Sequence, residues 1–340
     1  MDFIRHVKLS RLLEPGSQQT PGTRRCEVRI DPLTGRSTRI LDFPTRPVAP
    51  PELDGLIQKS KLMCPFCPES LERVTPCFMS PLEPRYLRGE ANCFPNAFPY
   101  DENGAVIVIS HAHYLALADF GAQLLTDAIA CSCDYLAAVG ALQREAVFQS
   151  INWNYMPLAG GSLVHPHLQA SASVSPTNYC REVLNGLENY RRRTGQAFWH
   201  ELVAAEQEQG ERFVAQGARL SWLVAFAPLG VFDVIGLMPG LSSPAELAGD
   251  LLAEVVEGLC KVLGFIDALG MHSLNMSIYF KTDEPDFVPH LRICPRVSIP
   301  PFGASQVNYL RMLHDESLTT VRPEDVCADL RAFWGNNQSL

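Results

Sequence analysis

The sequence lacks an apolar run long enough to span a bilayer, and it lacks an excess of positive charge. Charged residues make up 19% and hydrophobic residues 46% of its 340 positions, which is typical of a globular chain. Without about 20 consecutive apolar residues, no membrane-spanning segment is expected. The 28 Lys and Arg against 37 Asp and Glu give a net charge of −9, which disfavours binding to a phosphate backbone. The composition therefore predicts neither a membrane nor a nucleic acid as partner.

The amino-terminal residues also lack the features of a secretory signal. The segment MDFIRHVKLSRLLEPG mixes charged with apolar residues and has no continuous apolar core. A cytoplasmic location is expected on this ground. The 11 cysteines of such a chain are interpreted as reduced thiols and metal ligands rather than as a disulfide framework.

The length of the chain predicts two domains or two fused halves. Turn residues Pro32 to Gly35 predict a hairpin, and a strand over 105–110 precedes a helix over 121–149. Extended segments follow over 151–157 and 163–171, then a helix over 177–193. A similar order recurs, with strands near 211–216, 219–226 and 231–238, a helix over 244–268, and strands near 272–280 and 288–296.

This recurrence predicts an internal repeat. Pairing Val106 with Val234 gives an offset of 128 residues, and pairing His165-Pro166-His167 with His290-Leu291-Arg292 gives an offset of 125. The sequence is therefore interpreted as two α+β halves, residues 1–178 and 179–340, the second with His-x-Arg in place of His-x-His. Chance similarity is the alternative.

The segment GGSLVHPHLQ carries the most informative residues. If it is extended, His165, His167 and Gln169 project from one face. A neutral imidazole can attack phosphorus and form a covalent intermediate, while its neighbours fix its tautomer and hold the phosphoryl oxygens. Pro166 has no amide donor, which predicts an edge strand open to a ligand. The alternative is two ordinary surface histidines beside a proline.

A second pattern predicts a metal site. Cys64-Pro65-Phe66-Cys67 has the two-residue gap that lets both thiolates bind one zinc ion. His165, with either His111 or His113, would complete the set of ligands. Four protein ligands leave no open position, so the zinc would be structural. A redox or incidental cysteine pair is the alternative. Cys131 and Cys133 lie in a predicted helix and are expected to be buried rather than to bind metal.

Taken together, these motifs resemble the galactose-1-phosphate uridylyltransferase family, a branch of the histidine-triad superfamily. The resemblance rests on His-Pro-His-x-Gln at 165–169 and the preceding Gly160, Gly161 and Ser162, with Asn154 upstream. It also includes the CPFC segment, Ser110-His111-Ala112-His113 after a strand, Phe94-Pro95-Asn96-Ala97-Phe98, and IDPLTGR followed by Arg46-Pro47. The family implies an α+β fold of two tandem histidine-triad-like halves, each a mainly antiparallel sheet with packed helices.

The resemblance also implies roles for individual residues. His167 would be the nucleophile that accepts a nucleoside monophosphate, and Gln169 and Ser162 would contact its phosphate. One structural zinc would be bound by Cys64, Cys67, His113 and His165, with His113 preferred to His111 by motif position. The nucleotide site would be formed by Arg46, Phe94, Asn96, Phe98, Asn154, Gly160 and Gly161. Phe94 and Phe98 as core residues, and Arg46 as a solvated loop charge, are the alternatives.

The implied activity is nucleotidyl transfer from a nucleotide sugar to a phosphorylated acceptor, a sugar 1-phosphate, through a covalent nucleotidyl-histidine. Glutamine at position 169, where related hydrolases have histidine, favours transfer over hydrolysis. Ser277 and Arg292 stand where the family can have metal-binding histidines, so no second metal site is expected. NYLRMLHDESLTT lacks the residues associated with hexose recognition, and Ala97 replaces an expected aspartate, so neither galactose nor uridine specificity follows.

Two other functions remain open from the sequence. One is a phosphorylase that uses orthophosphate to cleave an ADP-sugar or a dinucleoside polyphosphate. The other is a nucleotide-binding module without turnover. The predicted open edge strand and the family resemblance favour a homodimer.

Overall fold

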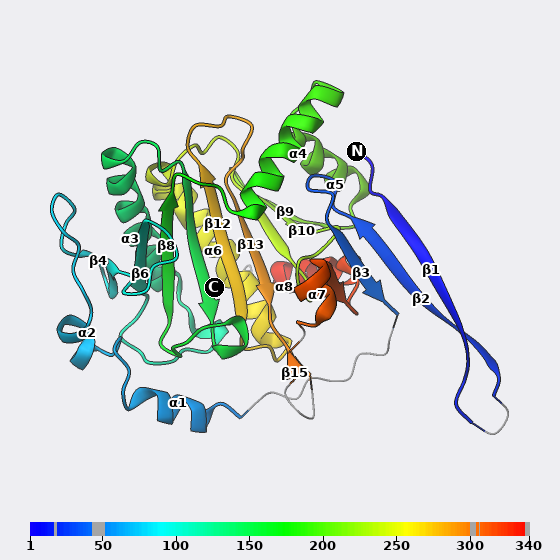
Figure 1. The fold of residues 1–340 in the computed structure, drawn as a ribbon, viewed down its shortest axis with the longest axis horizontal. Coiled ribbons are helices and arrows are strands. Elements are labelled where there is room, and N and C mark those ends of the chain that lie inside the picture. Colours follow the sequence, from blue (N-terminus) through cyan, green and yellow to red (C-terminus); the bar gives the residue numbers. More distant parts are fainter. Residues whose placement is uncertain (17–18, 43–51, 300–303, 306, 337–340) are drawn as a thin grey trace.

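The computed structural model describes residues 1–16, 19–42, 52–299, 304–305 and 307–336, and a sheet of ten strands forms its centre (Figure 1). Every neighbouring pair in this sheet is antiparallel. In spatial order the strands are β4 (Tyr86–Arg88), β5 (Ala91–Pro95), β6 (Asn103–Val108), β8 (His167–Ser173), β7 (Phe148–Tyr155), β12 (Leu274–Lys281), β13 (His290–Pro295), β11 (Val234–Leu237), β10 (Ser221–Val224) and β9 (Phe213–Gln216). The predicted α+β class is confirmed.

The strand order is the same when read from either edge of the sheet. The first half runs β4-β5-β6-β8-β7 and the second runs β9-β10-β11-β13-β12, so that β7 and β12 pair at the centre. Helix α3 (Ala122–Leu142) follows β6, and α6 (Gly249–Ala268) follows β11 at the matching place. The sheet is thus built from one unit used twice, while a division of the chain at residue 178 stays a prediction.

The register corrects one detail of the predicted repeat. Val106 lies opposite Gln169, whereas Val234 lies opposite Ile293, which belongs to the core beneath α3 and α6. Because side chains alternate between the faces of a strand, an offset of 128 places Val106 and Val234 on opposite faces and is wrong by one residue.

The predicted offset of 125 is also wrong. His167 and His290 both begin their strands, opposite Val108 and Leu237, and the prolines before them accept from the amides of Ile109 and Met238. His290 therefore matches His167, and Arg292 matches Gln169.

Helices α3 and α6 cover one face of the sheet (Figure 1). The alternation of the central strands explains this packing, because Ile151 and Trp153 of β7 and Met276 and Ile278 of β12 are buried against the helices. Helix α3 is long and apolar enough to span a bilayer by composition, but half of its most apolar window is buried in the protein. It packs against strands of the first half of the sheet, as the core helix of a globular domain does.

The opposite face has two separate apolar covers. Helices α4 (Asn178–Thr194) and α5 (Phe198–Gln209) pack over the second half. The Cys64–Cys67 segment and α2 (Pro68–Val74) pack over the first half. Between the covers, β7 and β12 present half-buried polar side chains, which we call the polar strip and define as Asn152, Asn154, Asn275 and Ser277.

The remaining elements lie around this sheet. A second sheet contains β1 (Arg5–Leu13), β2 (Pro21–Ile30), β3 (Ser37–Leu41) and β16 (Ser317–Thr319), and only the β3–β16 pair is parallel. The predicted hairpin around Pro32–Gly35 joins β2 to β3, and the β1–β2 hairpin projects from the body (Figure 1). The other described helices and strands are α1 (Asp54–Lys61), β14 (Ser298–Ile299), β15 (Ala304–Ser305), α7 (Tyr309–His314), α8 (Pro323–Asn336) and three short 3-10 helices over Leu117–Asp119, Pro157–Ala159 and Pro244–Glu246.

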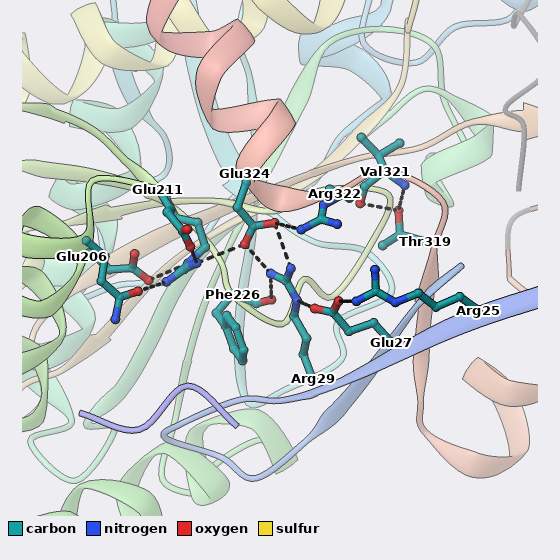
Figure 2. Close-up of polar contacts among 12 residues, drawn as sticks. Arg25, Glu27, Arg29, Glu206, Glu211, Phe226, Thr319, Val321, Arg322 and Glu324 are labelled. Atoms are coloured by element: carbon teal, nitrogen blue, oxygen red, sulfur yellow. Dashed lines mark hydrogen bonds and ion pairs between the residues drawn. The ribbon is translucent and has the colours of Figure 1, made fainter. Parts of the chain in front are cut away.

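A buried ion network ties the amino-terminal sheet to the second half of the chain. Arg29 of β2 is fully buried, and its guanidinium donates to Glu27 at 2.7 Å and to Glu324 of α8 at 2.7 and 2.8 Å. Figure 2 shows the carboxylate of Glu324 pointing toward the guanidinium of Arg29. Arg212, also buried, donates to Glu324 at 3.0 Å and to Glu206 at 3.0 Å. The amino-terminal sheet and α8 are therefore held together by paired charges rather than by apolar contact alone.

Candidate active site and metal centre

Four buried side chains form a group with the geometry of a metal site. The ligand atoms of Cys64, Cys67, His113 and His165 all lie within 4.8 Å of one another. His165 Nδ1 is 3.6 Å from Cys64 Sγ and 3.7 Å from Cys67 Sγ, and His113 Nδ1 is 3.5 Å from Cys67 Sγ. Tetrahedral zinc with bonds of about 2.3 Å to sulfur and about 2.0 Å to nitrogen separates two such ligands by about 3.6 Å. The group could therefore hold a metal ion.

Hydrogen bonds on the far side of each imidazole orient these ligands. His165 Nε2 donates to the carbonyl of Ser110 at 2.8 Å, and His113 Nε2 lies 2.9 Å from Ser60 Oγ. Both rings therefore turn Nδ1 toward the thiols, as ring nitrogens of metal-binding histidines are commonly held. His111, by contrast, is exposed and lies beside Glu90, so the structure places His113 and not His111 in the group. Sequence reasoning missed Ser60 because it lies outside the recognised motifs, and it missed the Ser110 carbonyl because a backbone acceptor leaves no signal in the sequence.

The pKa shifts of three of these side chains also fit a bound cation. Burial lowers the pKa of His165 to about 4, and burial likewise lowers the pKa of His113. Burial, followed by the neighbouring Cys64, raises the pKa of Cys67 to about 11. Two neutral imidazoles are ready to donate lone pairs, and a divalent cation would stabilise the Cys67 thiolate that burial otherwise disfavours. The donor set of two sulfurs and two nitrogens suits zinc.

His167 is the first residue of β8 and lies beside this group. Its Nδ1 is 2.7 Å from the carbonyl oxygen of His165, and because a carbonyl only accepts, Nδ1 carries the proton. Burial lowers the pKa of His167, so the ring is neutral and Nε2 has a lone pair. The Phe66 ring packs edge-on against His167, with centroids 5.2 Å apart. The imidazole is thus held in one tautomer by the residue that also belongs to the metal group.

The prediction that Pro166 marks an open edge strand is wrong. Strand β8 lies inside the sheet, between β6 and β7. Pro166 precedes the strand, where its missing amide proton disrupts no ladder, and its carbonyl accepts from the amide of Ile109 at 3.0 Å. A ligand would therefore have to approach His167 from the face of the sheet and not from an edge.

The glycine turn before the histidines is pinned to the end of β7. Gly160 has a φ of +86°, a conformation that glycine adopts without strain. A Cβ on Gly161 would lie 2.8 Å from the carbonyl oxygen of Asn154 and 3.1 Å from that of Met156, so only glycine fits there. Ser162, which follows, is exposed. The turn fixes where the backbone amides of this segment can meet a ligand.

The residues expected to line the nucleotide site fall into different environments. Phe94 is 2% exposed and packs against Phe66 in the core, whereas Phe98 is 84% exposed. Asn96 Oδ1 accepts from the amide of Phe98 at 3.0 Å. Gln169 lies on the face of the sheet that carries His167, and Arg46 lies outside the described residues. Roles for these residues in nucleotide binding stay predictions.

Sequence reasoning found Asn154 but missed most of the polar strip. Asn275 Nδ2 donates to Asn154 Oδ1 and to the carbonyl of Ala159, both at 2.8 Å. Ser277 Oγ donates to Asn152 Oδ1 at 2.8 Å. The segments INWNY and LNMSIY both alternate apolar and polar residues. This alternation could have predicted two neighbouring strands with their polar side chains on one face.

No protein-family model matches the chain. An uncharacterised protein from Archaeoglobus fulgidus is 27% identical over 336 residues, covering 98% of this chain and 99% of that protein.

Solved structures resemble the chain closely in fold but weakly in sequence. A GalT-like protein from Arabidopsis thaliana has a TM-score of 0.68 at 19% identity, covering 89% of this chain and 98% of that one. An ADP-glucose phosphorylase from Arabidopsis thaliana with bound ADP-glucose has a TM-score of 0.68 at 18% identity, covering 93% and 100%. A uridylyltransferase has a TM-score of 0.62 at 19% identity, covering 92% and 99%. The chain therefore has the GalT-like fold, and its resemblance to the galactose-1-phosphate uridylyltransferase family is confirmed at the level of the fold.

Proposed function

We propose that the protein is a nucleotidyl-transferring enzyme that acts through His167. The observation that carries the proposal is the neutral imidazole whose Nδ1 donates to the His165 carbonyl, next to a buried group of two cysteines and two histidines. An imidazole in this state is a nucleophile toward phosphorus without prior loss of a proton. The fold shared with an ADP-glucose phosphorylase and a uridylyltransferase supports this reading.

The reaction would proceed in two balanced steps. In the first, His167 Nε2 attacks the α-phosphorus of a nucleotide sugar, and the bond to the leaving sugar phosphate breaks as the N–P bond forms. In the second, a phosphate oxygen of the acceptor attacks the same phosphorus, and the N–P bond breaks to restore the neutral ring. Gln169, Ser162 and the amides at Gly160 and Gly161 would hold the phosphoryl oxygens as charge develops on them.

The metal would have a structural role in this mechanism. Cys64, Cys67, His113 and His165 would hold one zinc ion, and four protein ligands leave no place for water or substrate. A metal held there fixes the position of His165, and the His165 carbonyl in turn fixes the tautomer of His167. The zinc site would therefore act on the chemistry only through the orientation of the nucleophile.

A sugar 1-phosphate is the acceptor in the leading form of the proposal. Orthophosphate is the acceptor in a second form, which would make the protein a phosphorylase. The second form is supported by the ADP-glucose phosphorylase of the same fold and by a carboxyl-terminal segment, 308–320, that lacks the hexose-recognition residues of the resemblance. Both forms share the covalent intermediate.

Intact mass spectrometry of the zinc-loaded protein tests the shared step. The protein is incubated with UDP-glucose or ADP-glucose without an acceptor, and an acid-labile adduct of one nucleoside monophosphate is expected. Orthophosphate or a sugar 1-phosphate is then added, and the product released identifies the acceptor. If neither donor leaves an adduct, the protein is a nucleotide-binding module or acts by another route, and the proposal fails.

A further inference from the structure

A cleft in the second half of the sheet lies next to the polar strip and is lined by cations without a carboxylate. Its volume is about 240 Å³, and its walls include Asn275, Ser277, Arg292, Arg296 and Arg311. The cleft opens on the face that also carries His167, because Asn152 pairs with Gln169 on one side and with Ser277 on the other. It therefore belongs to the same surface as the proposed nucleophile without containing it.

The three arginines of the cleft differ in how their charge is compensated. Arg292 is paired with the fully buried Asp233, so its charge is neutralised beneath the cleft. Arg311 donates to Asp315 at 2.9 Å, although Asp315 also pairs with Arg36. Arg296 donates through a guanidinium nitrogen to Asn275 Oδ1 at 3.4 Å, and no carboxylate of the described residues pairs with it. Its Nε is buried and has no acceptor within the part of the chain that the structure describes.

This arrangement is unfavourable unless an anion completes it. Burial lowers the pKa of Arg296; the neighbouring Cys294 opposes this shift, and the like charge of Arg311 adds to it. A buried donor without an acceptor costs free energy, and two guanidiniums that face one cleft repel each other. The chain as a whole has a net charge of −9, whereas the residues that line this cleft include three arginines and no carboxylate.

The position of the cleft relative to His167 limits what the anion can be. Continuing the register two residues beyond the Asn152–Gln169 pair places His167 in one row with Asn154, Asn275 and Cys294. Strands lie about 4.8 Å apart, so Asn275 is about 10 Å from His167 and β13 about 14 Å. The Arg296 guanidinium contacts Asn275, two strands from His167, so a second phosphate on a molecule that reacts at His167 can lie along the polar strip and meet Arg296.

We propose that this cleft binds a second phosphate group of the acceptor, so that the preferred acceptor carries one phosphate that reacts at His167 and another that pairs with Arg296 and Arg311. The inference rests on the proposed function for the identity of the reacting end. Asn154, Asn275 and Ser277 would line the path between the two phosphates, where a sugar-sized spacer with hydroxyl groups finds both donors and acceptors. A charge-assisted contact at Arg296 would favour such acceptors over monophosphates.

Calorimetric binding to the zinc-loaded full chain tests the proposal without requiring turnover. Glucose 1,6-bisphosphate, glucose 1-phosphate and orthophosphate are titrated into the wild type, Arg296→Gln, Arg311→Gln and Arg144→Gln. Arg144 is exposed and remote from the cleft, so this last variant matches the change of charge. We expect the wild type and Arg144→Gln to bind glucose 1,6-bisphosphate about tenfold more tightly than glucose 1-phosphate. Arg296→Gln should abolish that preference, and Arg311→Gln should weaken it less because Asp315 already compensates part of its charge.

The outcomes separate this inference from the proposed function. Equal preference for the bisphosphate in Arg296→Gln and Arg144→Gln, with circular dichroism showing both folded, would overturn the cleft assignment. Binding of orthophosphate that depends on Arg296, with no advantage for the bisphosphate, would also overturn it, because the cleft would then hold a free anion. Failure of the adduct experiment in the wild type removes the proposed function but leaves the calorimetric preference measurable.

Discussion

The two halves of the ten-stranded sheet have the same strand order but surround their matching histidines differently. In the first half, His167 begins β8 with its Nδ1 bound to the backbone and its other nitrogen bearing a lone pair. In the second half, His290 begins the matching strand β13, and its Nδ1 also donates to a backbone carbonyl, that of Val288 at 2.9 Å. Its Nε2, however, accepts from the Tyr179 hydroxyl at 2.8 Å, and Arg292, which matches Gln169, is paired with buried Asp233.

The difference shows how one framework can hold the same imidazole with its second nitrogen either open or already hydrogen-bonded. The first half is covered by the Cys64–Cys67 segment, whose thiols form with His113 and His165 the group that could hold a metal ion. The second half is covered by α4 and α5, whose apolar side chains and Tyr179 enclose His290. Among the described residues, His290 belongs to no such group of thiols and imidazoles, and the Tyr179 hydroxyl bonds its Nε2, so this lone pair is not open to attack phosphorus.

The largest expected effect separates the two histidines that begin β8 and β13. His167→Ala should abolish the nucleotidyl adduct because no other group supplies the attacking lone pair. His290→Gln should keep adduct formation, since His290 lies in the other half of the sheet and glutamine can still bond Tyr179. Intact mass spectrometry measures both. Loss of the adduct in a folded His290→Gln variant would show that the halves do not differ in the way described.

Removal of a metal ligand should have the next largest effect, and it should fall on the first half. Cys64→Ser is expected to lower the zinc content measured by elemental analysis. The free energy of unfolding should fall by roughly 3 kcal/mol or more, a fraction of the ~10 kcal/mol that structural zinc contributes to small domains. Cys77→Ser changes an exposed cysteine outside the group and provides the matched control. Equal zinc content in the two variants would contradict the assignment of the ligands.

The corresponding change in the second half should affect stability without affecting zinc. Arg292→Met leaves Asp233 buried without its cation, which typically costs about 3–5 kcal/mol. The double variant Asp233→Asn/Arg292→Met should recover much of this loss, because no unpaired charge remains. Chemical denaturation and zinc analysis check both points. A double variant as unstable as the single one would mean that the arginine acts by packing and not by its charge.

Much of the fold could be predicted because its strands and helices carry strong periodic signals. The predicted helix over 177–193 agrees with α4, and the predicted strands near 272–280 and 288–296 agree with β12 and β13. The helix expected over 121–149 ends at Leu142, because the apolar residues that continue the pattern belong to the turn and to β7. The interior place of β8 was missed, because a proline beside a strand says nothing about how the strand is paired.

The metal group could be predicted because its ligands occur in recognisable short motifs, and the structure brings all four together. The cleft beside Arg296 could not be predicted. Its residues come from β12, β13 and α7, and only the register of the sheet places Asn275 next to Asn154. Whether a charge such as that of Arg296 is paired depends on distant neighbours, which spacing along the chain does not reveal.

The smallest expected effect concerns the network that joins the amino-terminal sheet to the second half. Burial alone would raise the pKa of Glu324, but hydrogen bonds and charge from Arg29, together with Arg212, hold that pKa at about 2. Because this value lies below the ordinary 4.5, the ionised carboxylate stabilises the folded state above about pH 4.5. That stabilisation, roughly 2 kcal/mol, should be lost as the pH falls from 4.5 toward 2. Denaturation of the wild type and Glu324→Gln at several pH values should therefore show a difference in the free energy of unfolding at pH 7 that shrinks below pH 4.5.

Glu257→Gln is the control. It changes an exposed carboxylate that pairs with Lys261, and the free energy of unfolding should differ little from that of the wild type at any pH. A pH-independent difference for Glu324→Gln would mean that the packing of the Glu324 side chain, and not its charge, holds α8 against the amino-terminal sheet.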